Sequence, residues 1–354
     1  MAPYADEFSS EANITCKNTI NGVSGRRSKD DTAYYTENAL CGELLGSIYT
    51  KKYFTEKEKQ DVTSMIGEIM QDYRIRLSGA DWLSEQTRAT AIGKLDAMKI
   101  RVGYPEKYRI DWDNVDVSAS KPFIENVITV MQEQRKMNLS LDGKKVDSGV
   151  WDNMNANTVN AFYDSSDNSI NFPAAILNDP MYDASRSHSY NLGAIGNVIA
   201  HEITHAFDSS GSQFDKDGNM TDWWTESDRA AFDDRTDKVA KYYSSIEIMD
   251  GLCINGELTK GETVADLGSM ACTLDIMRGM KDADYKEYFT AYANLWKEKI
   301  TPEAQESYAM TNPHPPTYMR FNVTVMQYQE FYDTFGIKEG DKMYIAPEDR
   351  LKVW

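Results

Sequence analysis

Apolar residues recur along much of the chain at the spacing of an α-helix. Between residues 56 and 83, offsets of three and four connect Val62, Met65, Ile66, Ile69 and Met70. These positions share one helix face. A second helix is expected to begin at Ser84, because serine is a favoured residue at helix N-termini. Similar patterns predict helices at 37–54, 122–137, 192–207 and 225–246, with further helices to about residue 310.

Two segments have the pattern of short strands. The run KIRVGYP at 99–105 predicts a strand that ends at the proline. Residues 150–177 alternate in polarity and contain the turn sequence SSDN, which predicts a β-hairpin. The expected fold class is therefore α+β, mainly helical with a small sheet. A boundary between domains or subdomains is expected near residues 113–120.

The composition is that of a globular protein with a strong negative charge. The chain has 354 residues, 41% hydrophobic and 27% charged, and a formal net charge of −18. Nucleic acids and anionic membranes would repel such a surface, so neither is an expected partner. No apolar run reaches the length of a transmembrane helix. The first residues, MAPYADEFSSEAN, lack the order of a secretory signal, so the chain is expected to be cytosolic unless a leader precedes it.

The four cysteines are far apart in the sequence. They are Cys16, Cys41, Cys253 and Cys272, and no two form a CxxC pair. This spacing excludes a cysteine-rich zinc site and argues against a disulfide framework. Free thiols in or near a core are the expected state.

One otherwise apolar segment, VIAHEITHAFD, holds two of the chain's four histidines. Residues four apart on an α-helix differ by about 40° in direction, so His201 and His205 can both reach one metal ion. Glu202 lies one step round the helix, where its carboxylate can contact a water on that metal. The H-E-x-x-H pattern thus supplies two ligands and a general base. The alternative is a pair of core histidines with satisfied hydrogen bonds.

A third ligand is expected downstream, because catalytic zinc takes three protein ligands and keeps one open position. In zincins that use glutamate, this ligand lies on a later helix, and the segment GETVADLGSM supplies Glu262. Asp266 follows four residues later on the same face, where it can accept the free ring N–H of a ligand histidine. Acidic pairs at this spacing are usually solvated. Here the apolar neighbours Val264, Ala265 and Leu267 imply burial, and buried carboxylates need partners.

These motifs resemble those of a known family. VIAHEITHAFD, GETVADLGS and NAFY match the neprilysin-like zinc endopeptidases, peptidase family M13, and the terminal KVW is similar as well. The resemblance covers essentially the whole chain and is densest from residue 150 onward. It implies a thermolysin-like zincin catalytic domain at 120–354. Residues 1–115 would be a helical remnant of a larger amino-terminal cap domain.

The resemblance also implies residues that contact the substrate. Asn160 and Ala161 of NAFY match positions on an edge strand that pairs with the substrate backbone. Met181 and Val198 are candidates to line the pocket for the side chain that follows the cut. By themselves, these residues would be interpreted as ordinary turn or core positions.

Two further residues match positions that take part in the chemistry. His314, in the loop NPHPPTYMRF, matches a histidine that stabilises the oxyanion of the tetrahedral intermediate. Arg320 matches an arginine that holds the carbonyl after the scissile bond and helps to orient the metal site. In this mechanism Glu202 takes a proton from the water that the metal activates and delivers it to the leaving amine.

The expected function is hydrolysis of oligopeptides on the amino side of hydrophobic residues, with one Zn²⁺ per chain. Members of the family are considerably longer than this chain, because their cap domain is larger. The alternative is a catalytically weak homologue that binds peptides, or that needs a partner chain supplying the missing domain. The cysteine pairs of secreted animal relatives are absent from the sequence, which favours the bacterial cytoplasm over secretion or surface exposure.

Overall fold

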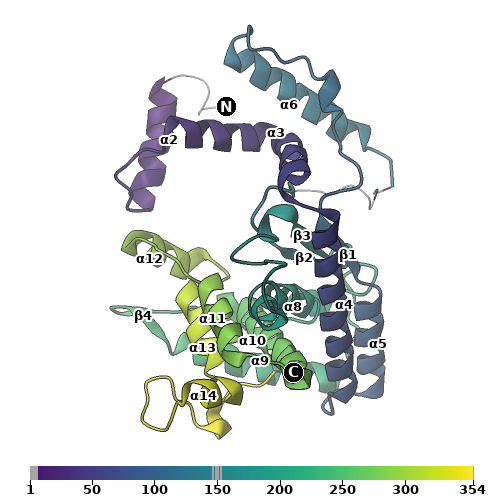
Figure 1. Ribbon diagram of the computed structural model, residues 1–354, viewed down its shortest axis with the longest axis vertical. Coiled ribbons are helices and arrows are strands. Elements are labelled where there is room, and N and C mark those ends of the chain that lie inside the picture. The colour runs from purple at the N-terminus through teal and green to yellow at the C-terminus, as the bar shows by residue number, and fades with distance from the viewer. Residues whose placement is uncertain (1–6, 146, 148–150, 152–153, 354) are drawn as a thin grey trace. The chain divides into compact units, whose positions relative to one another are not determined.

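The computed structural model describes residues 7–353 except 146, 148–150 and 152–153. The described part is mainly helical with few strands, which confirms the fold class expected from the sequence (Figure 1). Its internal contacts divide the chain into two compact units. The first comprises Met1–Glu56, Gly103–Asn160 and Pro173–Ala175; the second comprises Lys57–Val102, Ala161–Phe172 and Ile176–Trp354. Each unit is thus built from segments that are not consecutive in the chain.

Three helices form most of the first unit. They are α2 (Glu7–Ile20), α3 (Lys29–Tyr53) and α6 (Phe123–Ser140). Glu43 of α3 holds a later loop of the same unit by accepting the backbone N–H of Arg109 at 2.6 Å and the indole N–H of Trp112 at 3.1 Å. Helix α3 begins before residue 37, where the sequence pattern placed its start, because Ser28 caps it by accepting the Asp31 N–H at 3.0 Å.

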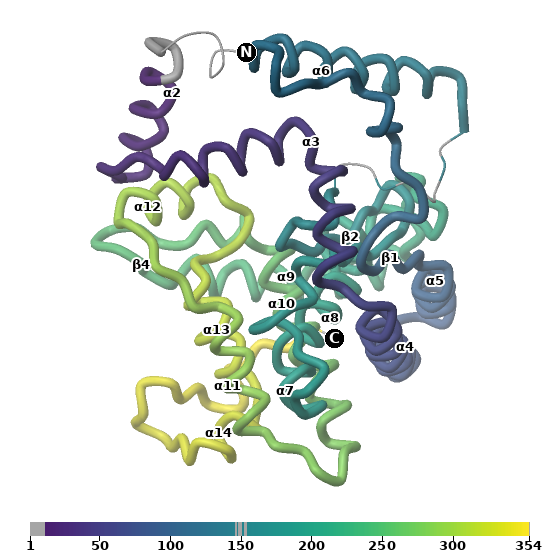
Figure 2. The backbone as a smooth tube through the Cα atoms, turned by 45° about the horizontal axis from the view of Figure 1, so that its top comes forward, coloured from purple at the N-terminus to yellow at the C-terminus, as the bar shows by residue number. Residues whose placement is uncertain are grey.

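The second unit contains the remaining helices. They are α4 (Glu56–Gly79), α5 (Glu85–Asp96), α7 (His188–Asn191), α8 (Asn197–His205), α9 (Glu226–Ser244), α10 (Gly256–Gly279), α11 (Tyr285–Leu295), α12 (Pro302–Thr311), α13 (Thr317–Val325) and α14 (Gln329–Phe335). Ser84 caps α5 by accepting the Thr87 N–H at 3.3 Å, as the sequence indicated. Helices α4 and α5 lie side by side (Figures 1 and 2). None of the described helices is both long and apolar enough to cross a membrane.

A small sheet accompanies these helices. Strands β1 (Lys99–Gly103), β2 (Phe162–Asp164) and β3 (Ser169–Pro173) pair in the order β1-β3-β2. β2 and β3 form the expected antiparallel hairpin, which leaves β2 at an edge. Its turn places Asn168 at φ 53°, a left-handed conformation that asparagine tolerates. Two short strands, β4 (Glu247–Met249) and β5 (Leu252–Cys253), form a separate antiparallel pair.

Helix α10 is the centre of the second unit's core and packs against both α8 and α9. On one side it joins a buried cluster that includes Leu192, Met270, Leu274, Tyr288 and Phe289. On another it joins a cluster that includes Phe232, Val239, Tyr243, Val264 and Leu267. Each large apolar side chain buried in this way contributes about 1.5–3 kcal/mol. This packing fixes α8 and α10 against each other and sets the directions of their polar side chains.

The helix that carries both histidines has an irregular start. Leu192–Gly196 is a π-helical turn between α7 and α8, inside the segment predicted as one helix. Asn197 Nδ2 donates to the carbonyls of Leu192 at 2.9 Å and Gly193 at 3.2 Å, which satisfies two acceptors of this turn. Such turns are common next to functional sites, because they shift the direction of the following residues.

Candidate metal centre

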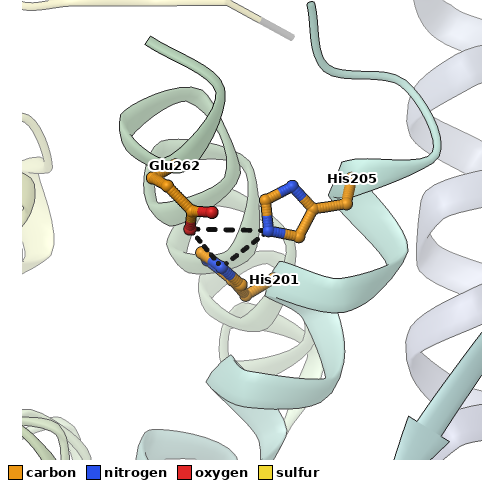
Figure 3. A group of neighbouring side chains, drawn as sticks. All are labelled: His201, His205 and Glu262. Carbon is orange, nitrogen blue, oxygen red and sulfur yellow. Dashed lines mark hydrogen bonds and ion pairs between the residues drawn. The ribbon is translucent and has the colours of Figure 1, made fainter. Parts of the chain in front are cut away.

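Helices α8 and α10 bring three potential metal ligands together (Figure 3). His201 Nε2 lies 3.0 Å from His205 Nε2 and 3.2 Å from Glu262 Oε2. The distance from His205 Nε2 to the same carboxylate oxygen is 3.5 Å. All three donor atoms lie within 4.8 Å of one another. In the part of the chain that the structure describes, no other group of three His, Cys, Asp or Glu residues meets this condition.

The chemistry of this donor set fits zinc. Two imidazole nitrogens and one carboxylate oxygen form a His₂Glu set, which is a known ligand combination for catalytic Zn²⁺. Burial by itself would lower the pKa of His201, but its hydrogen bonds to Asp266 and Glu262 raise that pKa overall. Burial would likewise raise the pKa of Glu262, yet the three histidines around it hold that pKa well below its usual range. The carboxylate is therefore ionised, as a metal ligand must be.

A carboxylate orients each of the two imidazoles. His201 Nδ1 lies 2.9 Å from Asp266 Oδ1, the residue for which the sequence suggested this contact. His205 Nδ1 lies 2.6 Å from Asp208 Oδ2. With Nδ1 engaged in this way, each ring keeps Nε2 for a metal. Asp208 was not among the residues predicted from the sequence, although it is the last residue of VIAHEITHAFD and follows His205 by three positions.

Arg320 is bound to Asp266. Its Nε and Nη2 donate to the two carboxylate oxygens at 2.9 Å and 2.7 Å, and its Cζ lies 3.8 Å from the centre of the Trp296 ring. Arg320 is 7% exposed and Asp266 is 1% exposed. Burial alone would raise the pKa of Asp266, but Arg320 and His201 lower it overall. The bidentate geometry and the aromatic face together stabilise a buried charge pair.

Glu202 and His314 are the two other residues expected at this centre. Glu202 is buried in α8, directly after His201. His314 Nε2 lies 3.1 Å from Glu262 Oε2, and the ring is partly exposed in the loop between α12 and α13. Asn312 Oδ1 accepts the His314 backbone N–H at 2.9 Å and lies 3.0 Å from the ring Nδ1, which fixes the loop and the ring together.

The other four expected substrate contacts, besides Arg320, lie in different surroundings. Asn160 is exposed and Ala161 is partly buried, and both directly precede edge strand β2. Val198 is partly buried in the first turn of α8. Met181 is also partly buried, and its carbonyl accepts the N–H of Ile195 from the π-helical turn at 2.9 Å. The roles of these residues in substrate binding stay predictions.

The fold and the site define a zincin-like metal centre, in which one helix carries H-E-x-x-H and a second buried helix carries the glutamate. Comparison with protein families agrees with this class. A model described as peptidase family M13 matches residues 160–351, and a second model of the same description, for the amino-terminal part, matches residues 1–105. The chain belongs to peptidase family M13.

Several of the similar proteins are bacterial. The neutral endopeptidase of Lactococcus lactis subsp. cremoris is 36% identical over 335 residues, which cover 95% of this chain and 53% of the relative. The crystal structure of PepO from Lactobacillus rhamnosis HN001 matches with a TM-score of 0.91 at 30% identity. The match covers 100% of this chain and 56% of the PepO chain. The crystal structure of the Mycobacterium tuberculosis zinc metalloprotease Zmp1 in complex with an inhibitor matches with a TM-score of 0.90 at 29% identity. That match covers 100% of this chain and 55% of the Zmp1 chain. The chain thus spans about half the length of the curated relatives it matches.

Proposed function

We propose that the chain carries the catalytic site of a zinc-dependent endopeptidase that hydrolyses oligopeptides. The observation that carries the proposal is the convergence of His201, His205 and Glu262, with the buried Glu202 directly after His201 in α8. Family membership and the similarity to a neutral endopeptidase and a zinc metalloprotease support it. One zinc ion per chain is expected, because the described residues contain one such donor group.

The residues around the ligands have distinct tasks in this reaction. Bound by the three ligands, zinc would lower the pKa of water toward neutrality and polarise the peptide carbonyl. Glu202 accepts the proton of the attacking water and delivers it to the leaving amine. His314, beside Glu262, donates from Nε2 to the oxyanion, a contribution of about 3 kcal/mol for one donor. Asp266 holds His201 and Arg320 in place.

Substrate binding is assigned to the remaining residues. Asn160 and Ala161 pair with the backbone of the peptide beside edge strand β2. Arg320 uses Nε and Nη2 for Asp266, and we assign its Nη1 to the substrate carbonyl that follows the scissile bond. Met181 and Val198 contact the side chain after the cut, which gives a preference for hydrophobic residues there.

A second candidate function follows from the length of the chain, which is about half that of its curated relatives. In this case the chain is a homologue with weak catalysis that binds peptides, or one that needs a partner chain with the remaining amino-terminal domain. The same metal centre would then require further residues to hold the substrate.

The test is cleavage of a quenched fluorescent peptide containing Phe or Leu by the full chain with one equivalent of zinc. We expect cleavage that a chelator abolishes. Glu202→Gln should lower the rate by about 10²–10⁴-fold while zinc stays bound, and Glu226→Gln, an exposed position at the start of α9, should leave the rate unchanged.

Each of the other outcomes has a defined meaning. Full activity of Glu202→Gln with zinc bound would overturn the role of Glu202. A chain that binds one zinc ion but cleaves no peptide would favour the second candidate. A chain that binds no zinc would overturn both.

A further inference from the structure

The buried side chain of Lys94 reaches the C-terminal end of α8, the helix that carries the two histidines. It lies on α5 and is 1% exposed. Its Nζ donates to three backbone carbonyls, at 2.9 Å to Ala206, 2.6 Å to Gly211 and 2.7 Å to Phe214. An ammonium group has three N–H donors and no acceptor, so these carbonyls satisfy all of its hydrogen-bonding capacity.

The three carbonyls belong to one stretch of backbone. Ala206 is the first residue after α8, Gly211 begins the 3₁₀ helix Gly211–Gln213, and Phe214 follows that helix. Carbonyls at the C-terminus of a helix have no partner within it, and the helix dipole favours a cation there. Lys94 therefore closes the end of α8 and holds the following turn against it.

The same turn holds Asp208. Its Oδ1 accepts the backbone N–H groups of Ser210 and Gly211, each at 2.7 Å, while its Oδ2 lies 2.6 Å from His205 Nδ1. Gly211 connects the two ends of this network, because its N–H donates to Asp208 and its carbonyl accepts from Lys94. The backbone approach requires glycine, since a Cβ on Gly211 would lie 1.8 Å from the His205 carbonyl oxygen.

The charge of Lys94 also suits this position. Asp208 is 3% exposed, and a buried carboxylate needs compensating charge. Burial lowers the pKa of Lys94 to about 8, and the nearby carboxylates of Asp208 and Asp215 oppose that shift. The lysine thus supplies a positive charge close to Asp208 without bonding to it. Both carboxylate oxygens of Asp208 stay free to interact with the turn and with His205.

We propose that Lys94 is a positioning residue of the metal centre. By fixing the turn that holds Asp208, it keeps the His205 imidazole oriented with Nε2 toward Glu262 and the metal. This inference rests on the metal site of the proposed function. It also gives the segment matched by the amino-terminal family model, residues 1–105, a task in metal binding.

The experiment measures the zinc affinity of the full chain by competition with a chromophoric chelator, together with thermal unfolding of the metal-free protein. Lys94→Met keeps much of the side-chain volume and removes the ammonium. We expect the dissociation constant to rise about tenfold, the lower end for changes around ligand histidines. The visible absorption of the Co²⁺-loaded protein should also change, because His205 is no longer held. The matched control, Ser84→Ala, weakens the cap of the same helix and should lower the unfolding temperature alone.

A double variant tests whether Lys94 acts through Asp208. If it does, Lys94→Met combined with Asp208→Asn should raise the dissociation constant by less than the product of the two single effects. Independent, multiplicative effects would overturn the proposal. An unchanged affinity and Co²⁺ spectrum in Lys94→Met would also overturn it.

Two further results distinguish an effect of the Lys94 substitutions on folding from an effect on metal binding. If Lys94→Met does not fold, the milder Lys94→Gln takes its place. Failure of both to fold while Ser84→Ala folds would assign Lys94 to folding alone and overturn the positioning role. Failure of the unmodified chain to bind zinc would instead overturn the proposed function.

Discussion

Gly193 lies so close to Tyr288 that a Cβ on Gly193 would be 2.2 Å from the Tyr288 carbonyl oxygen. This contact packs the π-helical turn before α8 directly against α11. Tyr288 is itself buried, and its hydroxyl accepts from Asn197 Nδ2 at 3.1 Å. The start of the helix with the metal ligands is therefore held by backbone contact, which only glycine permits.

Replacing Gly193 by alanine should destabilise the protein. The added methyl group must displace backbone, which costs about 1–3 kcal/mol in a tightly packed core. The matched control is Gly67→Ala in α4, where a Cβ would meet nothing within 4 Å and the residue is exposed. There alanine should stabilise the helix by about 0.5–1 kcal/mol. Urea unfolding of both variants checks the pair, and equal effects would contradict the role of the Gly193 contact.

Asp208→Asn should weaken zinc binding by about 10–100-fold. The asparagine oxygen can still accept from the turn, but its NH₂ group then faces His205 Nδ1, where an acceptor is required. The imidazole is expected to move its proton to Nε2, and that nitrogen can no longer bind a metal. The control is Asp217→Asn, an exposed residue paired with Lys216. Competition titration with a chelator measures both, and wild-type affinity in Asp208→Asn would exclude this orienting role.

Arg320→Met should lower the free energy of unfolding by about 3–5 kcal/mol, because it removes the guanidinium that donates to both oxygens of the buried Asp266 carboxylate. The loss of the contact with Trp296 adds to the effect. Arg74→Met removes an exposed ion pair with Asp96 and should cost less than about 1 kcal/mol. Denaturant unfolding of the metal-free variants provides the comparison. Similar losses in both variants would show that the buried pair adds nothing beyond an exposed one.

Asp228 should make stability depend on acid pH. It is 4% exposed and accepts the Ser84 N–H at 3.1 Å. Burial would raise its pKa, but hydrogen bonds from Ser84, Thr87 and Thr225 lower it to about 2. Because the folded pKa lies below that of the unfolded chain, about 3.9, the stabilisation is present above pH 4 and disappears as the pH falls toward 2. Its size is about 2 kcal/mol.

Asp228→Asn should therefore be less stable than the unmodified chain at pH 7, and this difference should shrink between pH 4 and pH 2. Urea midpoints across that range, measured without metal, follow the difference directly. A difference that stays constant from pH 7 to pH 2 would show that the carboxylate charge of Asp228 does not stabilise the fold.

Local sequence patterns were enough to predict several helices and the direction of the two ligand histidines. The period of apolar residues predicted α4, α6 and α9 but not α2, α13 or α14. Ser84 marked the start of α5, and the spacing of His201 and His205 placed both imidazoles on one face. These features depend on neighbours within about one helical turn, and such neighbours are visible in the sequence. Glu262 was found because it lies in a recognisable apolar segment.

Only the tertiary structure showed which groups orient His205, whereas Asp266, the partner of His201, was predicted from the sequence. Lys94 and Gly211 are 117 residues apart, and the contact between α5 and the end of α8 has no periodic signature. Asp208 follows His205 by three positions, but among 56 acidic residues this spacing alone does not show that its carboxylate is buried against the histidine. Burial gives these residues their roles, because a carboxylate or an ammonium removed from water must find a specific partner. The packing of α5, α8 and α10 determines both the burial and the partner.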